Sequence, residues 1–272
     1  MGQTLRVATL NIWGRHGDWD ARREVLQEGF RALQPDLIAL QETVVTDESD
    51  QTAELFGDDW HVLHQGRRST DGTGCSIVSR WPAVAVEEVD LCVTDRVDPD
   101  DFPGRTTAAE FETPAGPVLF VNHKPNWQLA YERERELQAV TAARAIERIT
   151  AGRELHVVLA GDFDARPETG SIRFWTGRQS LGDLSVNYQD AWEFAHPGES
   201  GHTFTVENPA ILAEADWGRI PARRIDYVMV RCDLRGPTLR IRSAERLFDR
   251  PVRGVFGSDH FGVIAELEEL SG

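Results

Sequence analysis

Short runs of β-branched and aromatic residues recur along the chain, and clusters of Gly, Pro, Asp and Asn separate them. Runs of this kind predict β-strands bounded by turns. The predicted strands are residues 5–12, 36–41, 60–65, 74–79, 83–90, 107–113, 117–122, 155–161, 225–231, 238–247 and 260–267. Two longer segments have a helical period instead: 18–34, with Asp18 as the N-cap and Pro35 as the stop, and 128–150, with Gly152 just beyond its end. This order of elements predicts a mixed α/β architecture with much antiparallel pairing.

The domain organisation is predicted from the chain length and from the Pro/Gly clusters between the predicted elements. The chain has no repeat period, and its Pro/Gly clusters are too short to act as interdomain linkers. A chain of 272 residues can bury a large core without division, so we expect residues 1–272 to form a single domain. The stretch 171–222 has weak periodicity and contains Pro turns. Because long loops in compact domains are usually functional or mobile, we expect a substrate-side loop region there.

The charge balance bears on binding partners. With 45 acidic and 29 basic residues, the formal charge is −16. Phosphate backbones are bound by basic surfaces, so this balance disfavours extended, sequence-independent binding to nucleic acid. It does not disfavour a metal ion that bridges an acidic site to a phosphate. Of the basic residues, 28 are Arg and only Lys124 is Lys, a bias that we attribute to genome composition rather than to function.

Other features of the composition bear on location. Polar residues interrupt every apolar run well before the ~20 residues that a membrane span needs, and the N-terminus has no signal-peptide pattern. The three cysteines, Cys75, Cys92 and Cys232, are an odd and widely spaced set. Such a set suits buried thiols in a reducing compartment. We therefore expect no membrane span and a cytoplasmic location, while nothing in the pattern indicates an oligomeric state.

Polar residues follow several of the predicted strands at the points where they end. Side chains at strand exits converge on one edge of a sheet, where α/β enzymes place their sites. The residues concerned are Asn11, Gln41 with Glu42, His123, and Asp162 with Asp164, and Ser258 with Asp259 and His260 open the last predicted strand.

Acidic residues dominate this predicted edge. Glu42, Asp162, Asp164, Asp226 and Asp259 would bring five negative charges together. Carboxylates at that density repel one another unless some are protonated or a cation binds. Oxygen ligands with one amide and no thiolate suit Mg²⁺ or Mn²⁺. The two histidines at the same edge could supply the proton-transfer and charge-stabilising groups that a hydrolase needs.

The same residues carry a family resemblance. The blocks that carry it are Thr9-Leu10-Asn11-Ile12-Trp13, Gln41-Glu42, Gly74-Cys75-Ser76-Ile77-Val78-Ser79-Arg80-Trp81-Pro82, Val121-Asn122-His123, Ala160-Gly161-Asp162-Phe163-Asp164-Ala165, Arg224-Ile225-Asp226-Tyr227-Val228 and Ser258-Asp259-His260-Phe261-Gly262. In this order they resemble the endonuclease/exonuclease/phosphatase superfamily, which includes deoxyribonuclease I and inositol polyphosphate 5-phosphatases. The resemblance implies an α+β fold, a four-layer α/β/β/α sandwich of two mixed, mainly antiparallel sheets.

The resemblance also implies metal ligands. Glu42 resembles the family's principal ligand of Mg²⁺, with Mn²⁺ as the alternative. Asn11 resembles a ligand or a partner of a metal-bound water. Asp259 resembles a further metal-linked carboxylate.

Catalytic roles are implied in the same way. His260 looks like the histidine that activates the attacking water or binds the scissile phosphate, and Asp226 looks like the carboxylate that orients it. Asp162 matches the aspartate that contacts the nucleophilic water, and His123 the histidine that contacts the phosphate. Either His260 or Asp162 is then the general base.

Two departures from the family pattern qualify this set. Asp164 stands where the family usually has Asn, so a carboxylate that only accepts hydrogen bonds replaces an amide that also donates. Our hypothesis is that Asp164 faces the same edge as Asp162 and ligates a second cation. The block Gly74-Cys75-Ser76 lacks the glutamate that supports the second histidine of deoxyribonuclease I. We therefore expect His123 to stabilise charge rather than to act as a strong acid.

The predicted function is a divalent-metal-dependent phosphoesterase that hydrolyses a phosphate ester by in-line attack of water. A DNA or RNA nuclease is the alternative within this class. A non-catalytic member that binds a ligand is the alternative outside it, and Asp164 is the feature that permits it.

Overall fold

Two β-sheets form the centre of the molecule. The computed structural model describes residues 2–98, 104–213 and 219–270. The first sheet has the order β12 (Leu239–Leu247), β13 (Gly262–Glu269), β1 (Thr4–Asn11), β2 (Leu37–Val44), β4 (Thr73–Ser79) and β3 (His61–His64). The second has the order β11 (Gly236–Pro237), β10 (Asp226–Asp233), β8 (His156–Asp162), β7 (Gly116–Lys124), β6 (Arg105–Thr113) and β5 (Ala85–Asp90), and β9 (Tyr188–Asp190) pairs with β10.

Most strand pairs are antiparallel, as the sequence predicts. The exceptions among the described strands are the parallel pairs β1 with β2 and β7 with β8, which are joined by the two long helices. Every predicted strand is confirmed, with ends that shift by a few residues. The short strands β9 and β11 were not predicted, because three and two residues carry no readable period.

The two predicted helices are also confirmed. The helices are α1 (Trp19–Leu33), α2 (Gln51–Phe56), α3 (Glu132–Thr150), α4 (Gly170–Trp175) and α5 (Ala191–Ala195), with 3₁₀ turns at Gly57–Asp59 and Pro209–Ala213. Asp18 caps α1 as predicted, because its side chain accepts a hydrogen bond from the backbone N–H of Ala21.

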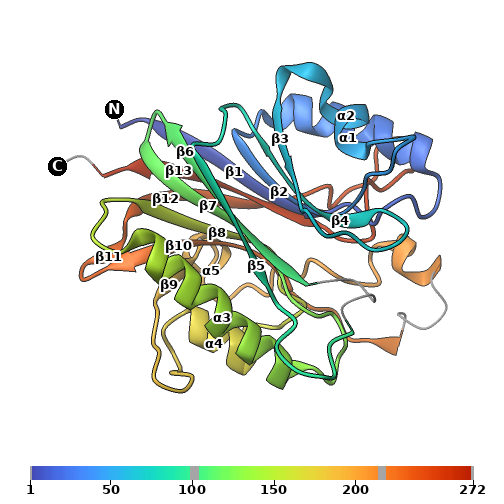
Figure 1. Ribbon diagram of the computed structural model, residues 1–272. Helices are drawn as coiled ribbons and strands as arrows, with labels where there is room; N and C mark the ends of the chain where they lie inside the picture. Colours follow the sequence, from blue (N-terminus) through green and yellow to red (C-terminus); the bar gives the residue numbers. More distant parts are fainter. Residues whose placement is uncertain (1, 99–103, 214–218, 271–272) are drawn as a thin grey trace.

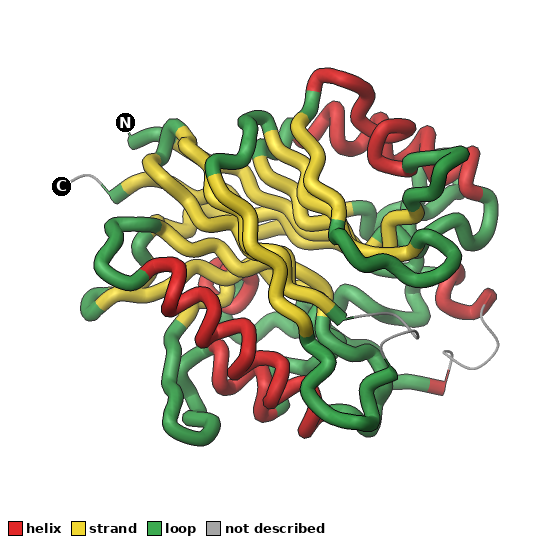
Figure 2. Tube along the Cα trace, in the orientation of Figure 1, coloured by secondary structure: helices red, strands yellow, loops and turns green. Residues whose placement is uncertain are grey.

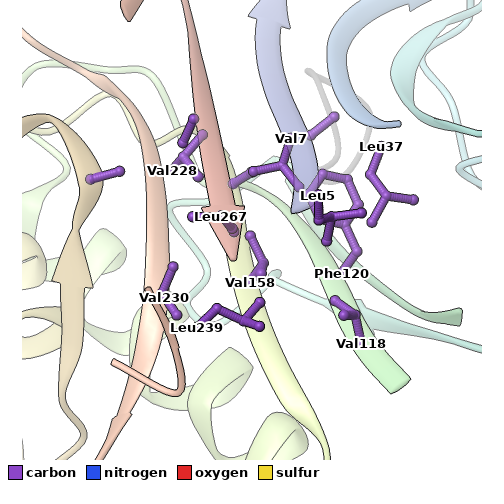
Figure 3. Packing of buried hydrophobic residues seen from close by; sticks show 14 of the residues in the cluster. Leu5, Val7, Leu37, Val118, Phe120, Val158, Val228, Val230, Leu239 and Leu267 are labelled. Atoms are coloured by element: carbon purple, nitrogen blue, oxygen red, sulfur yellow. The ribbon is translucent and has the colours of Figure 1, made fainter. Parts of the chain in front are cut away.

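The sheets pack face to face and helices cover their outer faces (Figures 1 and 2). The core between the sheets contains Leu5, Leu37, Phe120, Val158 and Val228, all fully buried (Figure 3). Side chains of α1 pack on the outer face of the first sheet, and those of α3 and α4 on the outer face of the second. These are the four layers of the α/β/β/α sandwich that the family resemblance implies.

A buried polar contact joins the two sheets beneath one end of the sandwich. Gln41 of β2 donates through Nε2 to Oδ1 of Asn122 of β7 over 2.8 Å. Asn122 in turn donates through Nδ2 to the carbonyl oxygens of Leu40 and Ser76. Buried amides that satisfy one another in this way fix the relative position of the strands that carry them. Glu42 and Lys124 are therefore held at the same level on facing sheets.

The stretch 171–222 is only partly the loop that its periodicity suggests. It contains most of α4, all of β9 and α5, and the turn at Pro209–Ala213. Its residues 214–218 lie outside the described residues.

No helix among the described residues is long and apolar enough to cross a membrane.

Candidate active site

All the predicted site residues except His123 gather at the end of the sandwich where β1, β2, β7 and β8 finish. β1 ends at Asn11, β7 ends at Lys124 and β8 ends at Asp162. β10 begins beside β8, since Asp226 pairs with Asp162 across the two antiparallel strands. The loop before β13 carries His260 to the same place. One end of the sandwich therefore collects polar side chains from both sheets.

The backbone at this end is conformationally unusual. Glu42, Asp164 and Trp13 have positive φ angles of 57°, 51° and 59°. Residues other than glycine rarely adopt this region, and when they do they cluster at functional sites. At Glu42 the positive φ falls where the pairing of β2 with β4 shifts register between Leu40 and Thr43. Such a bulge redirects side chains, so Glu42 does not follow the strict alternation of β2.

Asn11 links the carboxylates of the two sheets. Its Nδ2 donates to Oε1 of Glu42 over 2.7 Å and to Oδ2 of Asp162 over 3.1 Å. Its Oδ1 accepts the backbone N–H of Trp13 over 2.9 Å, which fixes the orientation of the amide. The structure thus brings together three residues that are predicted from the sequence.

Lys124 lies among the same carboxylates. Its Nζ is 2.5 Å from Oδ2 of Asp162 and 4.0 Å from Oε1 of Glu42, and it also donates to Oδ2 of Asp164. Burial would lower the pKa of Lys124, but Asp162, Asp164 and Glu42 outweigh it and raise the pKa well above its usual value. Lys124 is therefore a permanent cation at the site.

The close approach of β7 and β8 at the site depends on a glycine. Gly161 has a φ of 154°, a region that only glycine adopts readily. A Cβ at this position would lie 2.0 Å from the carbonyl oxygen of His123 on β7. The missing side chain lets β7 and β8 approach closely, which brings Lys124 next to Asp162.

His123 does not reach the site, contrary to the prediction. Its ring is buried on the other face of β7, where Nδ1 lies 2.7 Å from Oγ1 of Thr106 and the ring edge contacts Phe163 and Trp175. Burial lowers its pKa to about 3, so the ring is neutral at ordinary pH. Side chains alternate along a strand, so only one of His123 and Lys124 can face the site, and it is Lys124.

His260 and Asp226 form a buried pair. Nδ1 of His260 is 3.0 Å from Oδ2 of Asp226. Thr203, which is not among the predicted site residues, accepts the backbone N–H groups of Ile225 and Asp226 through its Oγ1. Burial would lower the pKa of His260, but Asp226 together with Asp259 and Asp162 raises it to about 10. The imidazole is therefore protonated at neutral pH.

This pair predicts a pH-dependent stability. Because the folded pKa of His260 is about 10 and its ordinary value is 6.5, the stabilisation is complete below pH 6.5 and is lost as pH rises towards 10. In EDTA, the difference in unfolding free energy between wild type and His260→Gln should shrink across that window, by at most about 1.4 kcal/mol per pH unit. Urea denaturation at pH 6, 8 and 10 measures it, and a constant difference would contradict the pairing.

Asp162 is surrounded by hydrogen-bond donors. Oδ2 accepts from Lys124 and Asn11, and Oδ1 accepts the backbone N–H of Asp164 over 3.0 Å. Burial opposes ionisation, but the charges of Lys124 and His260 and these hydrogen bonds lower the pKa of Asp162 to about 2. Asp162 is therefore an anion that is held in place from several sides.

Asp164 faces the site as the sequence predicts, but a protein cation meets it there. Its Oδ2 accepts a hydrogen bond from Lys124. Arg223, whose guanidinium also lies over the ring of Phe204, is a second positive charge near this carboxylate. The cation predicted at Asp164 is thus supplied by the Lys124 side chain, which leaves Asp164 a weaker candidate metal ligand than Glu42.

Asp259 is tied to the end of β1. Oγ of Ser258 donates to the carbonyl oxygen of Asn11 over 2.6 Å and lies 3.2 Å from Oδ1 of Asp259. The buried Arg22 of α1 donates to the carbonyl oxygens of Ile12 and Gly257, so it joins the loop after β1 to the loop before β13. The predicted ligands Asn11 and Asp259 are therefore held close to each other.

The acidic residues at this end of the sandwich offer a divalent cation two positions. Glu42 forms the first: its side chain is 28% exposed, and Asn11 orients its carboxylate by donating to Oε1 through Nδ2. The second is formed by Asp162, Asp226 and His260, whose ligand atoms all lie within 4.8 Å of one another, and a metal ion there requires His260 to give up its proton. In this group Oδ1 of Asp226 is buried and has no hydrogen-bond partner among the described residues. Carboxylate and amide oxygens suit Mg²⁺ and Mn²⁺.

The four-layer fold and the acidic, histidine-containing site at its end define a protein of the endonuclease, exonuclease and phosphatase class. The chain belongs to the Endonuclease/Exonuclease/phosphatase family, whose sequence model matches residues 8–260. Among curated proteins, none matches the chain significantly.

Solved structures show the same fold. TDP2 of D. rerio, complexed with single strand DNA product, has a TM-score of 0.74 at 16% identity and covers 98% of this chain and 99% of its own. Truncated TDP2 of Caenorhabditis elegans has a TM-score of 0.74 at 17% identity, with 97% of each chain covered. A family protein of Bacteroides thetaiotaomicron has a TM-score of 0.72 at 19% identity and covers 99% of this chain and 96% of its own. At these identities the likeness concerns the fold alone.

Proposed function

We propose that this chain is a divalent-metal-dependent hydrolase of a phosphate ester. The observation that carries the proposal is the buried, protonated His260 paired with Asp226, with ligand atoms of Asp162 within 4.8 Å. A buried cation beside an ordered anion is an arrangement that can bind a phosphate and direct a water molecule at it. The family membership supports the same reaction class.

The proposed role of each residue follows from its charge. His260, protonated and oriented by Asp226, donates a hydrogen bond to a phosphate oxygen and stabilises charge that develops there. Asp162, ionised and fixed by Asn11 and Lys124, accepts a hydrogen bond from the attacking water and takes up its proton. This assignment makes Asp162 the base. Glu42, oriented by its hydrogen bond from Asn11, would hold Mg²⁺ or Mn²⁺, and the ion when bound would supply Lewis-acid polarisation of a phosphate oxygen.

The test is hydrolysis of bis-p-nitrophenyl phosphate with Mg²⁺ or Mn²⁺, followed by a panel of nucleic acids, inositol phosphates, sugar phosphates and a sphingomyelin analogue. We expect turnover that EDTA abolishes and metal restores. If no substrate in the panel is hydrolysed by wild type at a rate above that of His260→Ala, the chain is a non-catalytic binding protein and the proposal is wrong.

Within this class we favour a substrate recognised through one phosphate. The formal charge is −16, and such a surface is unsuited to holding a long polyanion. The DNA product in the D. rerio TDP2 structure makes single-stranded DNA the second substrate to test. The two differ in salt dependence, because a protein that engages several phosphates weakens steeply with salt. A nearly flat dependence of kcat/KM on KCl supports the small substrate, and a steep decline supports the nuclease.

His123 gives a prediction that separates stability from activity. His123→Leu leaves Oγ1 of Thr106 without its ring partner in a buried position, so unfolding free energy should fall by about 1–3 kcal/mol. Because the ring faces away from the carboxylates, kcat/KM per folded molecule should change less than about 3-fold, well under the usual effect of a catalytic acid or base. Urea denaturation and the phosphodiester assay measure the two. A loss beyond 100-fold in a folded variant would return His123 to the catalytic set.

A further inference from the structure

The chain has one lysine, and it lies in the candidate active site. Of 29 basic residues, 28 are arginine and only Lys124 is lysine. If composition alone decided, arginine would be expected at this position too. The exception is therefore informative, because it falls where the ammonium group touches Asp162 and Asp164 and lies 4.0 Å from Glu42.

The contacts of Lys124 favour a compact cation. The side chain is 2% exposed, and its Nζ contacts carboxylates at the ends of β8 and β2. An ammonium is a point charge with donors in several directions, whereas a guanidinium is planar and larger. Three carboxylates around one nitrogen resemble the surroundings of a metal ion more than those of a surface ion pair.

The buried ion pairs of Lys124 with Asp162 and Asp164 are difficult to explain by a gain in folding stability. Burying an ammonium and its carboxylates carries a desolvation cost of several kcal/mol per ion, and apolar replacements of such pairs are often neutral or stabilising. Its place among the residues of the candidate site suggests instead that Lys124 sets the number of cations there. The two candidate metal positions described above share the neighbourhood of Asp162, whose Oδ2 already accepts hydrogen bonds from Lys124 and Asn11.

We propose that the Lys124 ammonium takes the place of a second divalent cation, so that the site binds one Mg²⁺ or Mn²⁺, on the side of Glu42. Asp164 is its positioning residue: it replaces a neutral amide with the carboxylate that balances the added positive charge. This inference rests on the proposed function for the identity of the metal, and it concerns the stoichiometry and the residues of this chain.

The first experiment uses the single lysine as a probe. Wild type labelled with [¹³C,¹⁵N]lysine gives side-chain NMR signals from Lys124 alone, and Mg²⁺ is added to the metal-free protein. We expect the signals to shift and to stop changing at one equivalent, with the ammonium still protected from solvent exchange. Saturation at two equivalents, or release of the ammonium into rapid exchange, would overturn the proposal.

The second experiment counts metal ions in variants. By Mn²⁺ binding in electron paramagnetic resonance, we expect one ion for wild type and for the exposed-residue control Arg31→Gln, two for Lys124→Gln, and one for Lys124→Gln combined with Asp164→Asn. A single ion in a folded Lys124→Gln would contradict the proposal. If that variant does not fold, the NMR titration of wild type decides.

These outcomes are distinct from a failure of the proposed function. Wild type that hydrolyses a phosphodiester and binds two Mn²⁺ ions keeps the proposed function and overturns the role of Lys124. If wild type binds one ion, keeps the Lys124 ammonium protected from solvent exchange and hydrolyses nothing, the proposed function is wrong. The role of Lys124 in place of a second metal ion is then supported.

Discussion

Replacing His260 with alanine is expected to lower kcat/KM for a phosphodiester by about 10²–10⁴-fold, the usual range for a group that transfers a proton or stabilises developing charge. The reason is that His260 is buried and positively charged, with a pKa raised to about 10 by Asp226, Asp259 and Asp162 against the effect of burial. Its removal leaves a phosphate facing carboxylates. The measurement is steady-state hydrolysis of bis-p-nitrophenyl phosphate with Mg²⁺ at neutral pH.

The matched control is His61→Ala, a histidine at an exposed position of β3, which should leave kcat/KM unchanged. Asp226→Asn should lower the rate less than His260→Ala, because the amide oxygen can still accept from the imidazole. The pH profile then separates two roles. If His260 is the cation, wild-type activity falls as pH approaches 10. If activity instead rises through that range while His260→Ala stays flat, His260 is the base and the assignment of Asp162 is wrong.

Much of the fold could be predicted from the sequence. Strands such as 74–79 and 155–161 are bounded by turn residues, and helix 18–34 has both a cap and a stop. These are local signals, and the structure follows them. The four layers were implied by the family resemblance rather than by periodicity. What local pattern could not supply was the short elements of 171–222: β9 forms by pairing with β10, α4 packs against α3, and α5 packs against β10 and β12.

The candidate site was predictable where a residue follows a strand end directly. Asn11 and Asp162 are the last residues of β1 and β8, and both lie where we expected them. At β7 the predicted site residue was His123, but the side chain that faces the site is that of the next residue, Lys124. Asn122 faces the first sheet and His123 faces α4, so alternation sends Lys124 to the site. Applying the two-residue period from Asn122 would have identified Lys124.

Other features of the site depend on contacts between distant segments. The left-handed conformation of Glu42 accompanies a shift in pairing with β4, and no sequence motif announces it. The bond between Gln41 and Asn122 joins residues that are far apart in the chain and sit on different sheets. Both arise from tertiary packing, which overrides what a single strand would do alone.

Cations of the protein itself pair with most of the acidic residues at the site. Five carboxylates at one edge were expected to require metal ions because they repel one another. Asp162 and Asp164 contact Lys124, and Asp226 contacts the protonated His260. Asp259 faces the charge of Arg22: burial lowers the pKa of this guanidinium and Asp259 opposes that shift. These cations compensate much of the negative charge without any metal. Glu42 is the carboxylate whose nearest described cation, Lys124, is 4.0 Å away, so the demand for a metal ion is concentrated there.

Because the need for a metal ion is greatest at Glu42, Glu42→Gln is the second substitution with a large expected effect. Glutamine keeps the size of the side chain and one acceptor oxygen but removes the negative charge, which a divalent cation needs most. Residues that merely support metal ligands change affinity by about 10–100-fold, so loss of the proposed principal ligand should weaken Mn²⁺ binding by about 100-fold or more. Activity should fall in parallel at low metal concentration and recover in part when metal is raised.

The control is Glu48→Gln, the same change at an exposed position in the loop after β2. Calorimetric Mn²⁺ titration and the metal dependence of phosphodiester hydrolysis should show wild-type values for it. The comparison also tests whether the metal ion binds at Glu42. If Glu42→Gln binds Mn²⁺ as tightly as wild type, the ion is held by Asp162, Asp226 and His260 instead, whose ligand atoms lie within 4.8 Å of one another. In that case the proton on His260 would have to leave when the metal binds, so metal affinity would rise steeply with pH, whereas binding at Glu42 should vary little between pH 7 and 8.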